Sequence, residues 1–215
     1  MDTNKNLYTI IYAVIMVVVV AVVLALASYL LKERQQRNVE IETKEMILNS
    51  VGLAAGADAA KDYASYIESE YDKYITDTSV VSSGESLPMF VTRKDGETFY
   101  TIPLKGTGLW GPIWGYITLK SDFNTIFGIV FDHKGETPGL GAEITTTQFT
   151  GQFRDKKIFE GENFVSVAVL KEGTGESTPH RVDAISGGTI TSKGVEDMLK
   201  VCISRYLDFF KNTKQ

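Results

Sequence analysis

Apolar residues are arranged in two ways along this chain. The stretch 7–31 is almost entirely apolar and carries no charged residue. At 1.5 Å per residue, a helix over this stretch covers roughly 37 Å, and the apolar core of a bilayer needs about 30 Å. Tyrosines lie toward both of its ends, where amphipathic rings prefer the membrane interface. The pattern predicts one transmembrane helix.

A cleaved signal peptide is the alternative interpretation of this segment. The apolar core of a signal peptide usually spans about 7–15 residues and ends at a small-residue cleavage pattern. The run here is longer, and SYLLKERQQR continues it as a helix. We therefore predict that residues 1–31 form a short N-terminal tail and a retained membrane helix.

Helical spacing continues beyond the membrane segment. Residues 32–75 are predicted to form a helical stalk, in which GLAAG at 52–56 marks a break before a second amphipathic helix at 61–74. The following stretch, 76–86, is polar and rich in serine and threonine, which predicts a loop. The stalk is thus expected to lead into a separate domain.

The pattern then changes to the alternation that is typical of strands. Runs at 89–93 and 98–103 flank an Asp95-Gly96 pair, which favours a tight hairpin. The other expected elements are strands at 114–120 and 125–131, a short helix at 143–153, a half-buried strand at 164–170, a loop at 173–178 and an amphipathic helix at 192–210. These elements predict an α+β fold class, with a single N-terminal transmembrane helix, an antiparallel sheet and packed helices, and with the soluble domain at 76–215.

Composition narrows the possible functions. The net charge is −5 and no basic run occurs, so nucleic acid is not an expected partner. Cys202 is the single cysteine, which leaves no intrachain disulfide, and its apolar helical context predicts a small buried side chain. His133 and His180 are not at metal-ligand spacing, so we expect structural or surface roles for both and no metal site.

The phosphate-binding pattern GxxxxGK[ST] and the hydrolase pattern GxSxG do not occur in this sequence, and it offers no persuasive pair of a nucleophile and a base. No catalytic residue is therefore assigned to the chain itself.

The first of two glycine-rich segments is GETPGLG at 135–141, directly after a predicted strand. Pro138 and Gly139 suit the second and third positions of a type II turn, because proline presets φ and glycine accepts a positive φ. The same backbone would let a planar ligand approach closely, with Glu136 and Thr137 offering polar contacts. Both interpretations stay open at this point.

The second segment is DAISGGTITS at 183–192, which leads into the last predicted helix. Thr191 or Ser192 can cap that helix by accepting a hydrogen bond from an orphan amide. The same amides and the helix dipole would suit a phosphate, although Glu196 and Asp197 would compete for the positive end. Spacing alone does not decide between a capped loop and a phosphate site.

Together the two segments carry a resemblance. ETPGLG upstream of DAISGGT, with TS following, resembles the FMN-binding domain of membrane redox complexes. The family pattern is Asp, two variable residues, Ser or Thr, Gly, Ala and Thr, and a separate flavin transferase links FMN to the final threonine by a phosphoester bond. The matching position here is Thr189. GLWGPIWG at 108–115 and the N-terminal span are similar to the C subunit of the Na⁺-translocating NADH:quinone oxidoreductase.

The resemblance implies a set of cofactor-binding residues around a covalent FMN. Thr189 would be the attachment point, and Asp183 would serve recognition by the transferase. The phosphate would lie near Ser186, Gly187, Gly188 and Thr191, and the flavin would lie near Glu136, Thr137, Gly139 and Leu140, with Trp110 or Trp114 close to the ring. The family usually has alanine where this chain has Gly188. We expect modification to survive, because glycine adds no bulk.

The resemblance implies that the chain is a flavoprotein subunit of a membrane complex. It would be anchored in membrane lipid and would relay electrons among the other subunits. Two alternatives are the G subunit of the Rnf complex, which shares both motifs, and a flavin-free tethered module for assembly or sensing. The family places the flavin domain on the periplasmic side of the bacterial inner membrane. Counting Lys32, Arg34 and Arg37 against Lys5 would place it in the cytoplasm. We follow the family.

Overall fold

The computed structural model describes residues 6–173 and 178–213. Contacts divide the chain into two compact units, Met1–Glu42 and Thr43–Gln215, and helix α1 (Asn6–Ser50) crosses the boundary between them. Neither glycine nor proline occurs within α1, so nothing in its sequence interrupts the helix. The predicted membrane helix and the first part of the predicted stalk, up to Ser50, are therefore one continuous helix.

In the first unit, α1 supplies the apolar segment that the sequence predicts. Within the described part of the chain it is the one helix long and apolar enough to cross a membrane, and its apolar side chains are exposed. The rings of Tyr8 and Tyr12 stack near its start, with centroids 6.5 Å apart. An exposed apolar surface of this length is unfavourable in water and is stabilised by lipid.

The second unit begins with the last turns of α1, where Ile47 and Leu48 are fully buried. The helix ends where Gly52 adopts a φ of +67°, inside the predicted break. A 3₁₀ turn, η1 (Ala57–Ala59), then leads to α2 (Tyr63–Tyr74), which Asp62 caps by accepting a hydrogen bond from the Ser65 amide at 3.2 Å. The predicted second helix is confirmed.

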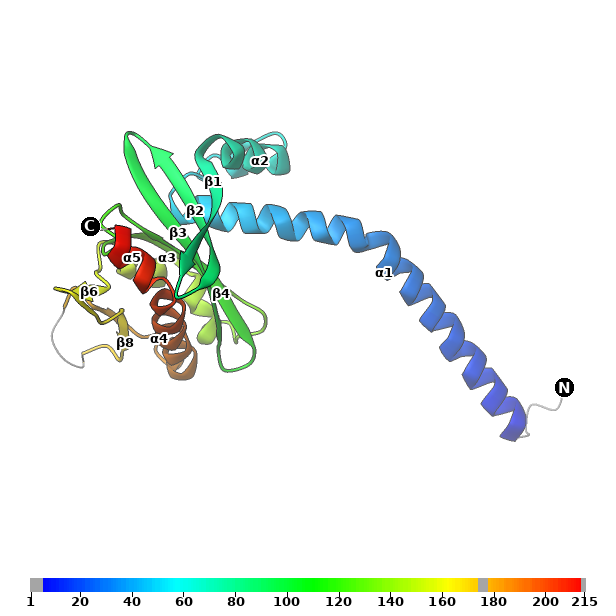
Figure 1. Cartoon of the computed structure of the whole chain (residues 1–215). Helices are drawn as coiled ribbons and strands as arrows, with labels where there is room; N and C mark the ends of the chain where they lie inside the picture. Colours follow the sequence, from blue (N-terminus) through cyan, green and yellow to red (C-terminus); the bar gives the residue numbers. More distant parts are fainter. Residues whose placement is uncertain (1–5, 174–177, 214–215) are drawn as a thin grey trace. The chain divides into compact units, whose positions relative to one another are not determined.

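An antiparallel sheet of five strands forms the centre of the second unit (Figure 1). The strands lie in chain order, so each pairs with the next. They are β1 (Ile75–Ser82), β2 (Glu85–Lys94), β3 (Glu97–Thr107), β4 (Pro112–Leu119) and β5 (Ile126–His133). The predicted α+β class with an antiparallel sheet is confirmed.

The hairpin between β2 and β3 forms where the Asp-Gly pair predicts it. Asp95 and Gly96 both have a positive φ, 53° and 81°, as a type I′ turn requires. The predicted loop at 76–86 is wrong, because this stretch forms β1 and the start of β2. β1 lies at the edge of the sheet, where most of its side chains are exposed and can be polar. Its serines and threonines therefore gave it the amino-acid composition of a loop.

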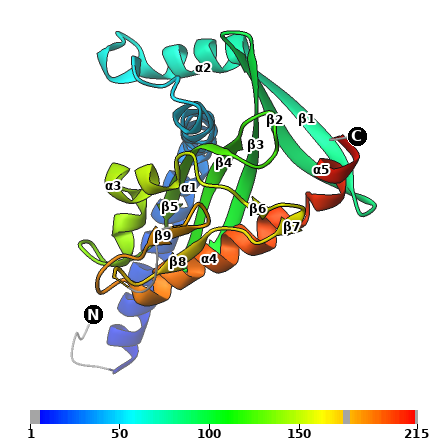
Figure 2. The ribbon, with the colours of Figure 1, turned by 90° about the vertical axis from the view of Figure 1, so that its left-hand side faces the viewer.

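Different elements pack against the two faces of the sheet. Helix α4 (Thr189–Ser204) lies across one face (Figure 2). Glycine allows its close approach to β3: a Cβ at Gly194 would lie 2.3 Å from the carbonyl oxygen of Thr107, and one at Gly106 would lie 2.7 Å from Cβ of Met198. Hence α4 is held at a fixed distance from the sheet.

On the opposite face, hydroxyl groups join the end of α1 to the sheet. The Ser50 hydroxyl lies 2.7 Å from that of Thr118, which in turn lies 2.7 Å from that of Thr101. All three residues are buried, so this chain of hydrogen bonds satisfies polar groups that would otherwise be costly to bury.

Between β5 and α4 the chain forms short elements. These are η2 (Gly141–Thr145), α3 (Thr147–Thr150), η3 (Gly151–Phe153), β6 (Phe159–Glu160), β7 (Asn163–Phe164), β8 (Ala168–Leu170) and β9 (Arg181–Asp183). The predicted helix at 143–153 is thus three short helical pieces. The predicted strand at 164–170 is broken where Ser166 adopts a φ of +63°. The predicted loop at 173–178 lies mostly outside the described residues.

The C-terminal helix is present but differs from the prediction at both ends. It consists of α4 and a second helix, α5 (Leu207–Thr213), and it begins three residues earlier than expected. Cys202, predicted to be buried, is only partly buried, and its thiol lies 3.4 Å from the backbone of Lys105. The inner side of α4 nevertheless carries the apolar residues that the spacing predicts.

Packing of α4 gives a first prediction. Leu199 is fully buried, whereas Val201 on the same helix is 61% exposed. Leu199→Ala should lower the free energy of unfolding by about 2–5 kcal/mol, since it removes buried contacts and leaves a cavity. Val201→Ala should change it by no more than about 0.5 kcal/mol. Urea unfolding of the detergent-solubilised full chain measures both, and equal effects would contradict the packing described.

Candidate functional site

The second glycine-rich segment is exposed at Ser186 and Gly187 and again at Thr189 and Ile190, the first two residues of α4. The helix begins at Thr189, its N-cap is Gly188, and neither a capping side chain nor an acidic residue is present there. The predicted cap by Thr191 or Ser192 is wrong, because both lie inside the helix. The Ser192 hydroxyl instead accepts a hydrogen bond from the Ile185 amide at 3.1 Å. The exposed side chain of Thr189 therefore lies at the positive end of the helix dipole.

The two glycines before Thr189 have different functions in the backbone. Gly187 has a φ of +75°, a conformation that residues with a side chain rarely adopt. Gly188 has an ordinary φ of −102° but is buried, and a Cβ on it would lie 3.0 Å from Cγ2 of Ile185. Alanine, usual in the family that the sequence resembles, would thus require a small shift of Ile185. The sequence did not reveal this close approach of Gly188 to Ile185.

Glu136, from the first glycine-rich segment, is 4% exposed and joins three parts of the domain. Its Oε2 accepts a hydrogen bond from the Thr191 hydroxyl at 2.6 Å, and its Oε1 accepts one from the Trp110 amide at 2.8 Å. The Glu136 amide donates to Nδ1 of His133 at 3.2 Å, a structural role for that histidine. The carboxylate thereby ties the start of α4 to the loop after β3 and to the end of β5.

Two further glycines leave space for this carboxylate. A Cβ at Gly108 would lie 2.5 Å from its Oε1, and a Cβ at Gly141 would lie 2.4 Å from its Oε2. The Gly141 position would also place a Cβ 2.5 Å from the Thr191 hydroxyl. The glycines of both loops therefore permit the close contact between Glu136 and α4.

The environment of Glu136 keeps its carboxyl group ionised. Burial raises its pKa, but hydrogen bonds from the Thr191 hydroxyl and from the amides of Trp110 and Gly111, together with nearby His133, lower it by more. The net pKa lies below the ordinary value. An anion near the first turn of α4 is also stabilised by the helix dipole.

The predicted type II turn after Glu136 is present. The Leu140 amide donates to the carbonyl oxygen of Thr137 at 3.1 Å, and Gly139, at the third position, has a φ of +75°. Thr137, Gly139 and Leu140 are exposed. Leu140 approaches the other glycine-rich segment, since a Cβ on Gly187 would lie 2.6 Å from its Cδ2. The two segments that the sequence shows separately thus form one site.

Large apolar side chains are exposed in the segments joined at this site. Leu109, Trp110, Leu140 and Ile190 are 48%, 69%, 41% and 59% exposed. Trp114 lies further along β4 and is partly buried. Exposed apolar groups in the loops around Thr189 provide contact area for a planar aromatic ligand.

A cleft of about 560 Å³ lies beside the loop that precedes Thr189, within the size range of small-molecule sites. It brings together Gly139, Asp183 and Ser186, while Thr189 is not among its lining residues. The lining is Gly139, Glu143, Thr146, Gln148, Phe149, Gln152, Glu172, Asp183, Ala184, Ile185 and Ser186.

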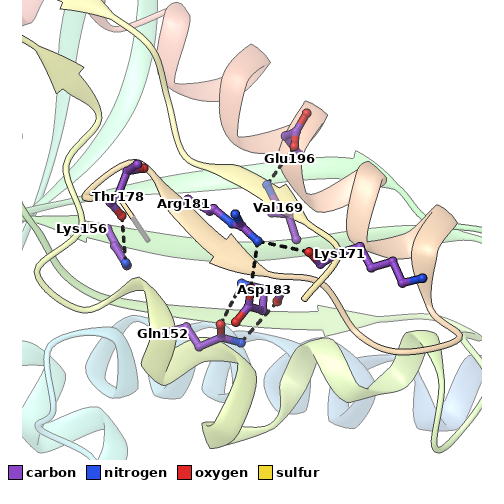
Figure 3. A network of polar contacts seen from close by, with 8 residues as sticks. All are labelled: Gln152, Lys156, Val169, Lys171, Thr178, Arg181, Asp183 and Glu196. Atoms are coloured by element: carbon purple, nitrogen blue, oxygen red, sulfur yellow. Dashed lines mark hydrogen bonds and ion pairs between the residues drawn. The ribbon is translucent and has the colours of Figure 1, made fainter. Parts of the chain in front are cut away.

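Asp183 is held by residues that the sequence did not identify (Figure 3). Gln152 accepts a hydrogen bond from the Asp183 amide at 2.8 Å and donates one to the Asp183 carbonyl oxygen at 3.3 Å. Arg181 lies 3.4 Å from the Asp183 carboxylate and donates to the carbonyl oxygen of Lys171 at 3.1 Å. Gln152 is 31 positions away in sequence and belongs to no motif, so only the fold reveals its contact.

The acidic residues of α4 lie away from its positive end. Because the helix begins at Thr189, Glu196 is about 10 Å along its axis. Its Oε2 accepts a hydrogen bond from the Val169 amide at 2.8 Å, and Lys193 forms ion pairs with both Glu196 and Asp197. The competition for the helix start that the sequence suggested is therefore weak.

Comparisons with known proteins identify relatives of this chain. The family model described as "FMN-binding domain" matches residues 108–204. The curated C subunit of the Na(+)-translocating NADH-quinone reductase of Neisseria meningitidis serogroup B is 34% identical over 164 residues, which are 75% of this chain and 62% of that protein. The same subunit of Vibrio vulnificus is 30% identical over shares of 75% and 63%. The chain thus spans less than two thirds of the length of these relatives.

Solved structures extend the similarity to the fold. The C subunit of the Na(+)-translocating NADH-quinone reductase from Parabacteroides distasonis superposes with a TM-score of 0.75 and is 40% identical, over 84% of this chain and 96% of that chain. Shewanella oneidensis NqrC, at 24% identity and a TM-score of 0.64, supports the fold alone. The chain therefore contains an FMN-binding domain, and a long apolar helix precedes this domain in the sequence. The chain belongs to the family of Na(+)-translocating NADH-quinone reductase C subunits.

The contacts of Glu136 predict a pH dependence. Its folded pKa is lower than its unfolded value of about 4.3, so the stabilisation is complete above that value and is lost as the pH falls through the folded pKa. Glu136→Gln should therefore be less stable than wild type at pH 7, and its stability should fall less steeply with acid. Urea midpoints from pH 7 to 3 measure this.

Glu162→Gln, at an exposed position in the turn between β6 and β7, is the control and should keep the wild-type profile. An unchanged slope in Glu136→Gln would show that this carboxylate does not stabilise the folded state.

Proposed function

We propose that this chain is a membrane-anchored flavoprotein subunit that carries FMN on Thr189 through a phosphoester bond. The observation that carries the proposal is the position of Thr189: an exposed hydroxyl in DAISGGT, at the start of a helix without a side-chain cap. The FMN-binding family model covers this position.

The residues present fit a phosphate at Thr189. The first amides of a helix have no partner within the helix, and the dipole there favours negative charge. Gly188 adds no side chain that would fill the space, and Lys193 lies one turn further on the helix. The phosphoester would take the place of the missing cap, and the exposed apolar residues Leu109, Trp110, Leu140 and Ile190 would offer contacts to the flavin.

The proposal assigns the attachment step to a separate flavin transferase. In the transfer, the Thr189 hydroxyl loses its proton and its oxygen bonds to the phosphorus of FMN. The phosphoanhydride bond of a flavin dinucleotide donor breaks, and a nucleoside monophosphate leaves with the bonding electrons. Asp183 would serve recognition by this transferase.

The proposed role is electron relay among the other subunits of a Na⁺-translocating NADH:quinone oxidoreductase. Bound FMN supplies the redox chemistry, and the protein positions it and keeps it from diffusing away. Two observations support the role: the relatives are named as subunits of that reductase, and the apolar helix α1 suits a single-pass anchor in lipid. The proposed location of the domain is the periplasmic face of a bacterial inner membrane.

Removal of the attachment hydroxyl tests the proposal. When the chain is produced together with the flavin transferase, Thr189→Ala should abolish the fluorescent band of the denatured chain, because denaturation releases any flavin that is not covalently bound. The matched control is Thr147→Ala, which changes an exposed threonine at the start of α3 and should keep the band.

A fluorescent Thr189→Ala band would place the flavin elsewhere. A wild-type chain without fluorescence, despite an active transferase, would favour the flavin-free tethered module.

The side of the membrane is tested by labelling. Asn163→Cys in a Cys202→Ser background introduces one exposed thiol at the start of β7. A membrane-impermeant maleimide should label it in cells whose outer membrane is permeabilised and whose inner membrane is intact. Labelling that appears only after the inner membrane is broken would place the domain in the cytoplasm.

A further inference from the structure

Strand β9 is paired on both sides at Asp183. On one side β9 forms a parallel pair with β8, in which the Ala184 amide donates to the carbonyl oxygen of Leu170 at 2.8 Å. On the other side, the Gln152 side chain receives the Asp183 amide and donates to the Asp183 carbonyl oxygen (Figure 3). The side-chain amide of Gln152 thus makes, with Asp183 alone, the pair of hydrogen bonds that the backbone of a neighbouring strand would make.

These contacts fix one end of the loop between Asp183 and Thr189. Its other end is fixed at α4, where the Ile185 amide is bound by the Ser192 hydroxyl and the Gly188 amide donates to the carbonyl oxygen of Ile185 at 3.0 Å. The loop between Asp183 and Thr189 is therefore held at both ends by identifiable hydrogen bonds. The Asp183 side chain remains 49% exposed at the wall of the 560 Å³ cleft.

Resting on the proposed function, we propose that Gln152 is a positioning residue for flavin attachment. It acts through Asp183, by holding the backbone of that residue so that its carboxylate and the Thr189 hydroxyl are presented to the transferase in a fixed relation. Arg181, buried beneath, adds a contact to the carboxylate itself. Gln152 need not touch FMN to have this effect.

The physical reason is the cost of ordering a loop during an encounter. A loop that is already held in its reactive arrangement does not pay this conformational entropy when the enzyme binds. Without the two Gln152 bonds, this end of the loop is held less firmly, by β8 and Arg181 alone, and part of that cost falls on the transfer reaction. The loss should therefore appear as a lower kcat/KM for the protein substrate, with Thr189 itself unchanged.

The test measures FMN incorporation into the full, detergent-solubilised chain by purified flavin transferase with a flavin dinucleotide. Gln152→Glu keeps the shape and the acceptor but removes the donor, so kcat/KM should fall by about tenfold or more. Gln148→Glu adds the same charge to the same cleft from an exposed position on α3, and its kcat/KM should stay within about twofold of wild type. Thermal unfolding confirms that each variant is folded, and Gln152→Ala replaces Gln152→Glu if the latter is not.

Dependence on Asp183 distinguishes positioning from general destabilisation. Asp183→Asn should slow incorporation by itself. If Gln152 acts through Asp183, the double variant should be no slower than Asp183→Asn, within about twofold. If the two residues acted independently, the two losses in kcat/KM would instead multiply in the double variant.

Three results would each overturn the inference while leaving flavin attachment in place. They are a wild-type kcat/KM in folded Gln152→Glu, a loss in Gln148→Glu equal to that in Gln152→Glu, and a double variant whose loss is the product of the two single losses. A wild-type chain that takes up no FMN would instead refute the proposed function.

Discussion

The buried carboxylate of Glu136 is the contact on which the geometry of the site depends. An ionised group inside a protein is tolerated only when hydrogen bonds replace the water it has lost. Here the donors come from the Thr191 hydroxyl and the backbone at Trp110. Each donor belongs to a different segment, so satisfying one charge brings the segments together. Thr191 is two residues from Thr189, so this contact also supports the proposed attachment point.

The glycines explain how such a contact can form. Gly108 and Gly141 leave room around the carboxylate, and Gly106 and Gly194 let α4 approach β3. The site that results combines a closely packed support with the exposed side chain of Thr189, the proposed attachment point. Because Thr189 is exposed, a second protein can reach its hydroxyl, and the attached group would face outward. This arrangement suits a carrier that must exchange electrons with neighbouring proteins.

Sequence reasoning succeeded where a local rule determines the structure. Lack of charge over a sufficient length predicted the apolar helix, and the Asp95-Gly96 pair predicted the hairpin, because turn geometry depends on these two residues alone. It failed where tertiary contacts decide. The edge strand β1 has the polar composition of a loop, and α4 starts at Thr189 because Ser192 binds the preceding loop instead of capping the helix. Gln152 carried no signal at all, since its effect depends on a partner that is distant in sequence.

The most direct test of covalent flavin attachment is mass spectrometry of the tryptic peptide 182–193, which contains Thr189 between the cleavage sites Arg181 and Lys193. The chain should be produced with its flavin transferase and fragmented so that the modified residue is located. We expect the added mass of a phosphoester-linked FMN, assigned to Thr189. An unmodified peptide, or FMN assigned to Ser186 or Thr191, would contradict covalent attachment at Thr189.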